Sequence, residues 1–288
     1  MTVYMFPGQG SQYKGMGKDL FDKYPEFLDK ADSFLGYSVR DLCLDDIGDK
    51  LNNTQYTQPA LFVVSALSYL NEVELTGVIP DYVIGHSVGE YSALFASGLL
   101  DFETAIRLVI KRGQLMSKAE NGAMAAIIGL NKDKVNKILK QNKINSVWVA
   151  NDNSSLQVVI SGEQQIVPEL SSLFLNNGAT YFVPLKVSGA FHSPLMKTAK
   201  DEFTHALDEA RLNSICIPAI SNVNARPYAK QRVKLLLSEQ ITGQVRWLES
   251  IEYLLSIGEF EFKELGPGSV LTKLVNNIKN EYKVSACQ

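Results

Sequence analysis

The sequence predicts an α/β protein in which a large domain with a parallel sheet holds a smaller inserted domain. Two observations predict this class. Apolar strand-like segments alternate with helical ones in both terminal parts of the 288-residue chain, as a parallel sheet covered by helices requires. Between those parts, the order strand, helix, strand, strand, helix, strand is typical of a ferredoxin-like fold. We expect the large domain at residues 1–122 and 188–288 and the small domain at residues 123–187.

The first 120 residues are predicted to form the N-terminal half of the large domain. Pro25 and Pro59 suit the first turn of a helix, where a backbone N–H lacks an intrahelical partner in any case. Asp101 suits the N-cap of the helix that follows it. The predicted strands are residues 3–6 and 82–84, and the predicted helices are residues 25–35, 60–70, 88–96 and 101–118.

The inserted domain is predicted from the change of pattern after residue 123. Its strands are expected at residues 124–129, 147–150, 157–161 and 181–187, and its helices at 133–142 and 164–176. A turn is expected at residues 151–154, and Pro168 fits the second helix only in its first turn. The chain then returns to the large domain, with helices at 197–211, 248–256 and 269–278 and strands at 216–221 and 260–265. A cleft between the domains is the expected ligand site.

The composition excludes several classes of function. With 45% hydrophobic residues the chain can bury a large core, and a net charge of −3 gives no general attraction to nucleic acid. The N-terminal residues show no signal peptide, and no apolar run is long enough to span a membrane, so we expect a cytosolic protein. Cys43, Cys216 and Cys287 are far apart and odd in number, which favours neither a disulfide framework nor a zinc site.

The most informative stretch is Gly85-His86-Ser87-Val88-Gly89, a G-x-S-x-G pattern between an apolar segment and a helix-like one. Small residues on both sides allow a sharp strand-to-helix turn that pushes the serine hydroxyl out at the top of a sheet. The N–H groups that open the helix favour a developing negative charge. Ser87 is therefore a candidate acyl-enzyme nucleophile, although these five residues alone fit an ordinary strand-loop-helix junction equally well.

Arg112 falls within the apolar face of the helix predicted at residues 101–118. A buried guanidinium is costly unless a carboxylate or several carbonyls meet it. One explanation is a structural ion pair or a side chain that extends to solvent, and the other is a site that grips a substrate carboxylate. The apolar residues around it are Ala105, Leu108, Val109, Leu115 and Met116.

Only three histidines are available as a general base for Ser87. His86 is its immediate neighbour and would have to fold back over its own backbone to reach the hydroxyl. His205 lies off the apolar stripe of its predicted helix and is expected to be solvated. His192 lies in the small-residue loop at 188–194, after the last strand of the small domain, and is expected to face the cleft. It is therefore the favoured base.

The loop Gly8-Gln9-Gly10 follows the first predicted strand. Tyr13 stands where the dinucleotide-binding fingerprint requires Gly or Ala, and no Lys-Ser/Thr pair makes the loop a phosphate-binding P-loop, so a nucleotide site is not favoured. A glycine-flanked turn after a strand can instead offer a backbone N–H to an oxyanion.

Seven motifs stand in order along nearly the whole chain: FPGQGSQ at 6–12, TQPA at 57–60, GHSVGEYSA at 85–93, KRGQLM at 111–116, AFHS at 190–193, ISNV at 220–223 and ELGPG at 264–268. Together they resemble the motifs of the malonyl-CoA:acyl carrier protein transacylase family. Seven ordered motifs are far more specific than one G-x-S-x-G pattern. The resemblance implies an α/β-hydrolase-like large domain with an inserted ferredoxin-like domain, in agreement with the pattern of elements.

The resemblance also implies catalytic roles. Ser87 would be the nucleophile and His192 the base, and the backbone N–H groups of Gln9 and Val88 would form the oxyanion hole. In this family a main-chain carbonyl, rather than an aspartate, orients the histidine, and here that carbonyl falls near Gln240. The lack of an obvious third acid is therefore expected.

For the substrate, the resemblance implies that Arg112 clamps a malonyl carboxylate and that Gln58, Met116 and Phe191 complete the binding site. In related acyltransferases the segment that ends at the catalytic histidine reads Ala-Phe-His for malonyl and Ala-Ser-His, with a preceding Tyr, for methylmalonyl. Here residues 190–192 read Ala-Phe-His. A bulky Phe191 would crowd an α-methyl group, although excluding one methyl supplies only about 1–3 kcal/mol. Malonyl is therefore favoured.

The implied reaction moves malonyl from coenzyme A to the phosphopantetheine thiol of an acyl carrier protein, with no metal and no bound cofactor. Residues 35–40 and 101–104 look most like the discrete acyltransferases that serve polyketide synthases in trans, and a fatty-acid malonyl transacylase is the alternative. We expect a monomer that binds neither nucleic acid nor membranes. Because carrier proteins are acidic, one basic cluster is a docking candidate, although such clusters are usually only a solvated face; it comprises Arg226, Lys230, Arg232 and Lys234.

Two other functions fit the same scaffold. A thioester hydrolase that clears stalled acyl chains needs no carboxylate clamp, so Arg112 speaks against it. A catalytically silent docking module has no need of a core-facing arginine or of an intact set of Ser87, His192 and Gln9.

Overall fold

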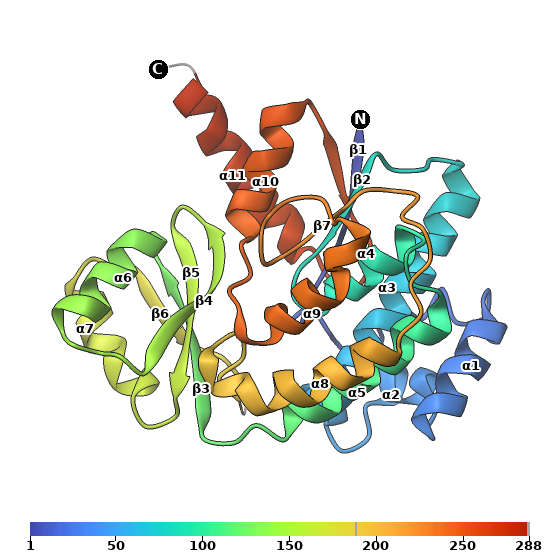
Figure 1. Cartoon of the computed structure of the whole chain (residues 1–288), viewed down its shortest axis with the longest axis horizontal. Helices are drawn as coiled ribbons and strands as arrows, with labels where there is room; N and C mark the ends of the chain where they lie inside the picture. Colours follow the sequence, from blue (N-terminus) through green and yellow to red (C-terminus); the bar gives the residue numbers. More distant parts are fainter. Residues whose placement is uncertain (188, 287–288) are drawn as a thin grey trace.

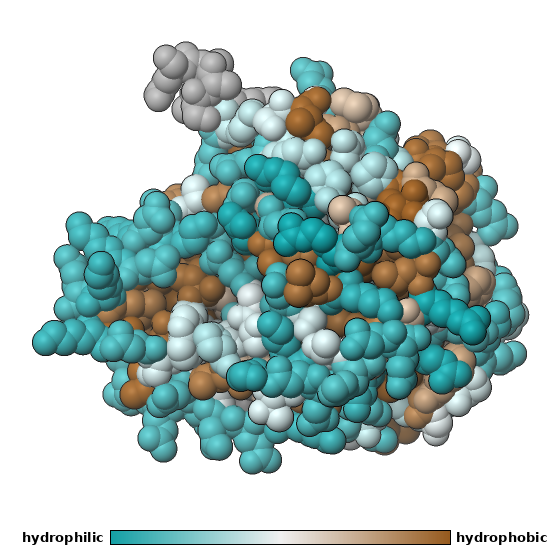
Figure 2. Space-filling model, viewed as in Figure 1, coloured by the Kyte–Doolittle hydropathy of each residue, from teal (hydrophilic) through white to brown (hydrophobic). Residues whose placement is uncertain are grey.

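A computed structural model describes residues 1–187 and 189–286 of the chain. Ser188, at the start of the predicted histidine loop, and Cys287 lie outside the described residues. Two separate four-stranded sheets organise the described part of the chain (Figure 1). Hydrophilic residues cover most of the face shown in Figure 2, with smaller hydrophobic patches between them. The described part contains no helix that is both long and apolar enough to cross a membrane.

The sheet of the large domain is parallel, with strand order β7-β2-β1-β8, which confirms the predicted class. Its strands are β1 (Thr2–Phe6), β2 (Tyr82–Gly85), β7 (Ala219–Ile220) and β8 (Glu261–Glu264). Phe6 pairs with Gly85, so the loop after β1 and the turn after β2 leave the sheet at the same edge. In open α/β sheets this carboxyl edge is where ligands bind.

Helices cover both faces of this sheet because β1 and β2 are apolar on both sides. Val3, Met5 and Ile84 pack with α10 and α11, whereas Tyr4 and Phe6 point to the other face and pack in the large core with α3, α4 and α5. The helices of this part are α1 (Pro25–Leu35), α2 (Val39–Asp45), α3 (Thr54–Thr76), α4 (Gly89–Ala96), α5 (Phe102–Ser117), α8 (Lys197–Glu209), α9 (Val233–Thr242), α10 (Trp247–Ile257) and α11 (Val270–Ala286), with short 3-10 turns at Lys50–Asn52, Pro194–Met196 and Lys230–Arg232.

The second sheet is antiparallel with strand order β4-β5-β3-β6, the order of a ferredoxin-like fold, and it lies to the left in Figure 1. Its elements are β3 (Gly122–Ile128), α6 (Lys132–Gln141), β4 (Val147–Ser154), β5 (Gln157–Glu163), a 3-10 turn at Val167–Leu170, α7 (Ser171–Asn176) and β6 (Tyr181–Pro184). It has its own apolar core, which includes Ile127, Ile160 and Phe174. This sheet begins at Gly122, the last residue before the predicted 122/123 boundary, and ends at Pro184, before the 187/188 boundary; both domain boundaries stay predictions.

The edge strand β4 of the small domain is joined to the large domain by backbone hydrogen bonds. The N–H of Val245, just before α10, donates to the carbonyl of Ala150 at 2.8 Å, and the N–H of Asp152 donates back to the carbonyl of Val245 at 2.9 Å. An ion pair between Lys132 and Asp152, 2.8 Å apart, lies beside this contact. The end of the segment that follows α9 is therefore fixed to the small domain.

The prediction for Pro59 was wrong. It was expected to open a helix, but α3 begins five residues earlier at Thr54, where the Asn53 side chain accepts the N–H of Gln55 at 3.2 Å. This side-chain cap gives the helix its start, and Pro59 lies inside the helix. The loss of one backbone hydrogen bond at Pro59 is tolerated because packing of the buried, apolar following turns stabilises the helix.

The turn predicted at residues 151–154 was also wrong, because those residues continue β4 to Ser154. Shifts in the strand register between Val149 and Asn151 and between Asp152 and Ser154 allow these polar residues to remain in the strand. The strand expected at 216–221 is confined to Ala219 and Ile220. The helix expected at 164–176 starts as a 3-10 turn with Pro168 in its first turn, as that proline requires.

Candidate active site

The G-x-S-x-G turn has the strained geometry that its sequence predicts. Ser87 has φ +52°, in the left-handed region, between the end of β2 and the start of α4. A Cβ at Gly85 would lie 2.0 Å from the backbone of Gly89, and a Cβ at Gly89 would lie 2.2 Å from the carbonyl oxygen of Phe6. Both glycines are therefore required for the strand and helix to approach so closely. Ser87 itself is only half-buried and thus reachable from solvent.

Asn222 holds this turn in place, a role that the sequence analysis missed. Its side-chain oxygen accepts the N–H of Ser87 at 2.8 Å, and its side-chain nitrogen donates to the carbonyl of Gly85 at 2.7 Å. One carboxamide thus satisfies a donor and an acceptor on either side of the bend. The signal in the sequence was the asparagine of the ISNV motif, two residues after the end of the strand at 219–220.

The Ser87 hydroxyl lies 2.8 Å from Nε2 of His192, and Nδ1 of the same ring lies 2.8 Å from the backbone carbonyl oxygen of Gln240. A carbonyl can only accept, so Nδ1 carries the proton and Nε2 is free to accept from the serine. Gln240 lies in the last turn of α9, where carbonyls lack intrahelical partners and carry the negative end of the helix dipole. The predicted contact of His192 with a main-chain carbonyl is therefore present, on a helix that the sequence analysis missed.

His192 is buried, and its surroundings favour the neutral ring. Burial lowers the pKa of His192 to about 3, and the positive charge of Arg112 acts in the same direction, whereas the hydrogen bond to Gln240 opposes both. The residue has φ +59°, so its backbone is also in the left-handed region. The imidazole is thus held in its neutral form, with Nε2 unprotonated.

Arg112 is completely buried on α5 beside the serine. Its Nη2 donates to the hydroxyl oxygen of Ser87 at 3.2 Å and to the side-chain oxygen of Gln240 at 2.9 Å. Within the described residues, Nε and Nη1 find no hydrogen-bond acceptor, and no carboxylate lies within ion-pair distance of the guanidinium. Burial lowers the pKa of Arg112, whereas the nearby side chains of Tyr91 and Glu90 raise it. The guanidinium nevertheless stays charged. The structural ion pair is therefore not the explanation for its burial.

The other residues expected to bind substrate are buried nearby. Gln58 on α3 donates from Nε2 to the sulfur of Met116 at 3.5 Å, and Met116 lies one turn after Arg112 on α5. Among the described residues, the side-chain oxygen of Gln58 meets no donor. Phe191, next to His192, is 5% exposed, and its ring fills the space where a side chain at Gly189 would lie.

The loop after β1 lies directly on the serine turn. A Cβ at Gly8 would lie 2.5 Å from the carbonyl oxygen of His86, so only glycine allows this contact. Gln9 follows at once, and its side chain donates to the hydroxyl of Thr54 at 3.1 Å. Val88 stands at the N-cap of α4, where backbone N–H groups lack intrahelical acceptors. The two N–H groups expected to bind an oxyanion therefore belong to adjoining segments.

The remaining two histidines lie as the sequence analysis expected. The His86 ring nitrogen Nε2 is 2.9 Å from the side-chain oxygen of Asn153, on the small domain, and is not the partner of Ser87. His205 is exposed on α8. Among the described residues, no group of three or more His, Cys, Asp or Glu side chains could hold a metal ion.

A parallel sheet with a strained serine turn at its carboxyl edge and a neighbouring histidine defines the class of serine enzymes that work through an acyl-enzyme. The sequence matches the acyl transferase domain family over residues 3–277. It is 50% identical to the polyketide biosynthesis malonyl CoA-acyl carrier protein transacylase PksC of Bacillus subtilis, over 98% of both chains. It is also 50% identical to the polyketide biosynthesis protein PksE of the same organism, over 98% of this chain but only 37% of that longer protein.

Comparison with solved structures points to the same family as the sequence comparison. A crystal structure of malonyl CoA-acyl carrier protein transacylase from Burkholderia pseudomallei superposes with a TM-score of 0.95, at 46% identity and over 98% of both chains. A malonyl-transacylase in complex with a type II polyketide synthase acyl carrier protein matches with a TM-score of 0.92, at 36% identity, over 97% of this chain and 93% of its own. The chain belongs to the acyl transferase domain family, which confirms the resemblance seen in its motifs.

We expect Gly89→Ala to destabilise the protein by about 3 kcal/mol or more, because the added Cβ would overlap the backbone of β1. Gly48→Ala is the matched control: Gly48 has φ +79° but open space around it, so only the backbone conformation opposes the change, at about 1–2 kcal/mol. Chemical denaturation measures both free energies of unfolding. Equal losses in the two variants would contradict the close approach of strand and helix.

We expect the His192 ring to stay neutral, with its proton on Nδ1, as the pH falls from about 8 to about 5, because its pKa lies below the ordinary value of about 6.5. Nitrogen NMR of the histidine rings reports this state, and a His192→Gln sample identifies the signals. A titration midpoint between about pH 6 and 7 for these signals would contradict the burial argument.

Proposed function

We propose that the protein is a malonyl-CoA:acyl carrier protein transacylase that works by a ping-pong mechanism through an acyl group on Ser87. The observation that supports this most is the buried guanidinium of Arg112, which touches the serine hydroxyl and whose Nε and Nη1 nitrogens have no acceptor among the described residues. A buried charge with vacant donors is costly unless an anionic ligand meets it. The carboxylate of malonyl, two bonds from its thioester carbonyl, is such a ligand.

In the first half-reaction, the Ser87 hydroxyl gives its proton to Nε2 of His192 as its oxygen attacks the thioester carbonyl. The resulting oxyanion is assigned to the N–H groups of Gln9 and Val88, and fixed donors of this kind are each worth about 2.7–4 kcal/mol. The imidazolium keeps its Nδ1–H on the Gln240 carbonyl. When the C–S bond breaks, the Nε2 proton passes to the thiolate of coenzyme A, which leaves as the thiol.

In the second half-reaction, the phosphopantetheine thiol of a carrier protein gives its proton to the neutral His192 and attacks the malonyl-serine ester. Collapse of that intermediate returns the proton to the oxygen of Ser87 and releases malonyl carrier protein. One thioester is exchanged for another, so the overall reaction needs no energy source.

Arg112 couples recognition of the substrate to the strength of the base. Its positive charge is one cause of the lowered pKa of His192. A malonyl carboxylate that pairs with the guanidinium offsets this charge, so the imidazole becomes a stronger base when the correct acyl group is bound. An acyl group without a carboxylate leaves the base weak.

The names of the relatives bear on the pathway. The chain shares 50% identity with PksC, which is named for polyketide biosynthesis, and 39% with the malonyl CoA-acyl carrier protein transacylase of Bacillus subtilis. We therefore propose that it serves a polyketide synthase in trans, with the fatty-acid role as the alternative. A carrier protein hydrolase is less favoured because the Arg112 site would then have no ligand. A cytosolic location and a monomeric state stay proposals from the sequence.

We expect Arg112→Ala to lower acylation of Ser87 by malonyl-CoA at least about 30-fold, while acylation by acetyl-CoA is kept, because only malonyl carries a carboxylate. Arg107→Ala is the matched control, since Arg107 is an exposed arginine on the same helix, with its guanidinium 4.0 Å from the centre of the Phe34 ring. Intact-mass measurement after mixing with each coenzyme A thioester reports the acylated fraction. Unchanged malonyl loading in Arg112→Ala would rule out the clamp.

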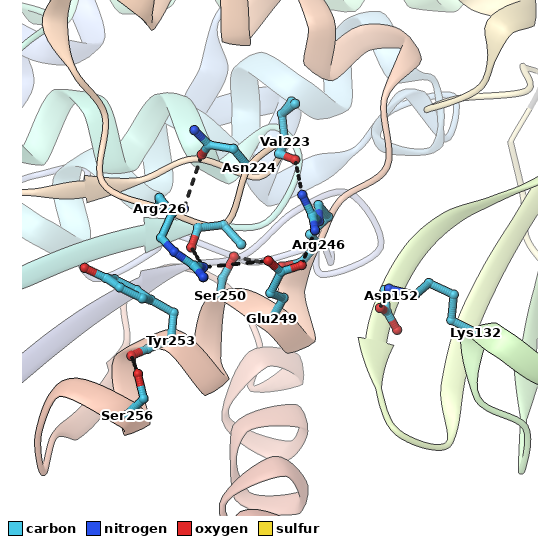
Figure 3. Close-up of polar contacts among 11 residues, drawn as sticks. Lys132, Asp152, Val223, Asn224, Arg226, Arg246, Glu249, Ser250, Tyr253 and Ser256 are labelled. Atoms are coloured by element: carbon cyan, nitrogen blue, oxygen red, sulfur yellow. Dashed lines mark hydrogen bonds and ion pairs between the residues drawn. The ribbon is translucent and has the colours of Figure 1, made fainter.

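Two residues of the basic cluster proposed for carrier docking, Arg226 and Lys234, already contact other groups of the protein. Arg226 lies 3.7 Å from the carboxylate of Glu249, which also pairs with Arg246, and its guanidinium lies 4.6 Å from the ring centre of Tyr253 (Figure 3). Lys234 donates to the carbonyl of Asp208 at 2.8 Å. Lys230 and Arg232 form the exposed turn before α9, the helix that ends at the active site. These two residues remain the docking candidates.

We expect the double change Lys230→Glu and Arg232→Glu to raise the KM for carrier protein several-fold and to leave acylation by malonyl-CoA unchanged, because only the second half-reaction needs an acidic protein partner. Lys50→Glu, a charge reversal of an exposed residue elsewhere, is the control. Initial rates at varied carrier protein and ionic strength measure the effect. An unchanged KM would remove this cluster from the docking surface.

A further inference from the structure

Glu90 is a fully buried acid three residues after the nucleophile, in the first turn of α4, and the reaction described above does not use it. Its Oε1 accepts the N–H of Asn222 at 2.8 Å and the hydroxyl of Tyr228 at 2.6 Å. Its Oε2 accepts an N–H of the Gln240 side chain. All three partners are neutral donors, so hydrogen bonds rather than an ion pair hold this carboxyl group.

The Gln240 side chain joins Glu90 to Arg112. Its nitrogen Nε2 donates to Glu90 and also to the backbone carbonyl of Ser87, at 2.8 Å. A carbonyl can only accept, and the carboxylate of Glu90 accepts as well, so the nitrogen must face this side. The oxygen of the carboxamide is thereby turned toward Arg112, where it accepts from Nη2 at 2.9 Å.

This arrangement brings a negative charge close to Arg112 without neutralising it. A carboxylate in direct contact with the guanidinium would compete with the substrate carboxylate for the same donors. The intervening carboxamide fixes Nη2 and leaves Nε and Nη1 unpartnered among the described residues. Burial is the largest effect on the pKa of Glu90 and keeps it raised to about 7 even though the three donors and the charge of Arg112 act in the opposite direction. The convergence of three donors on its two oxygens is what favours the carboxylate.

We propose that Glu90 is a positioning residue for acyl-group selection: it fixes the orientation of the Gln240 carboxamide, which in turn holds the Arg112 guanidinium where a malonyl carboxylate can meet it. The inference rests on the proposed transacylase function. Glu90 would touch neither the substrate nor the side chain of the nucleophile. It would nevertheless help to determine which acyl group is accepted.

Glu90→Gln tests this with almost no change of shape. Three donors converge on the side chain at position 90, but a glutamine has only one acceptor oxygen and would direct its own N–H₂ at one of them. If that group faces Gln240, the carboxamide must rotate and present N–H₂ to Arg112. If it faces the other way, it meets the N–H of Asn222, which disturbs the serine turn instead.

We expect Glu90→Gln to lower the ratio of kcat/KM for malonyl-CoA to that for acetyl-CoA at least about tenfold, about 1.4 kcal/mol, with acetyl transfer affected much less. Tyr228→Phe is the matched control, because it removes one donor to the same carboxyl group and leaves the contact with Gln240 in place. Its ratio should stay within about twofold of the wild type. Equal losses in the two variants would mean a general effect of the buried acid and would overturn the proposal.

A double-mutant cycle separates positioning from folding. Gln240→Met removes the carboxamide and keeps both the side-chain length and the backbone carbonyl that binds His192. We expect the same loss of malonyl preference in this variant, and no further loss when Glu90→Gln is added to it, because both changes act through one side chain. A wild-type ratio in Gln240→Met overturns the proposal even if Glu90→Gln does not fold.

The wild-type protein separates this inference from the proposed function. If it forms no malonyl-Ser87 with malonyl-CoA, the transacylase function fails. If it loads malonyl normally and Glu90→Gln keeps the same preference over acetyl, the transacylase stands and only the role of Glu90 fails. Thermal melting of each variant and its acetyl-loaded fraction confirm that folded protein is compared.

Discussion

A positive charge buried against the nucleophile is the constraint on which the rest of the site depends. Arg112 has lost its solvation, touches the Ser87 hydroxyl and meets no carboxylate among the described residues. A charge in such a place is tolerated only if neutral dipoles surround it and nearby groups avoid a like charge. The oxygen of the Gln240 carboxamide is such a neutral dipole, and His192 avoids a like charge because its ring is neutral. The cost of an unfilled site supports the proposal that an anionic acyl group is its ligand.

Gln240 contacts both His192 and Arg112, so one residue positions two side chains of the site. Its backbone carbonyl fixes the tautomer of His192, and its side chain fixes Arg112. The residue stands in the last turn of α9, so the first role needs only the end of a helix. The second needs an anchor beyond the site, and Glu90 supplies it. The side chains of His192, the proposed base, and Arg112, the proposed substrate clamp, are therefore held in a fixed position relative to each other.

Features of the site that depend on residues close together in the sequence could be predicted from it, whereas contacts between distant residues could not. The serine turn is encoded within five residues, and Arg112 stood out because helical periodicity alone placed it on an apolar face. Gln240 was found only through resemblance, because the helix that carries it has a weak amphipathic pattern and no capping side chain. The contacts of Glu90 with Asn222 and Gln240 join residues more than 130 positions apart, and no local pattern reports such pairs.

The strand order has a consequence for how the protein is made. β1 precedes both of its neighbours in the chain, because β2 follows some 80 residues later and β8 lies at Glu261–Glu264. Until β8 has been synthesised, one edge of this apolar strand lacks the partner it has in the folded sheet, and such edges invite association with other nascent chains. Translation therefore leaves a long interval in which chaperone protection of the N-terminal segment matters, and truncated products would expose that edge permanently.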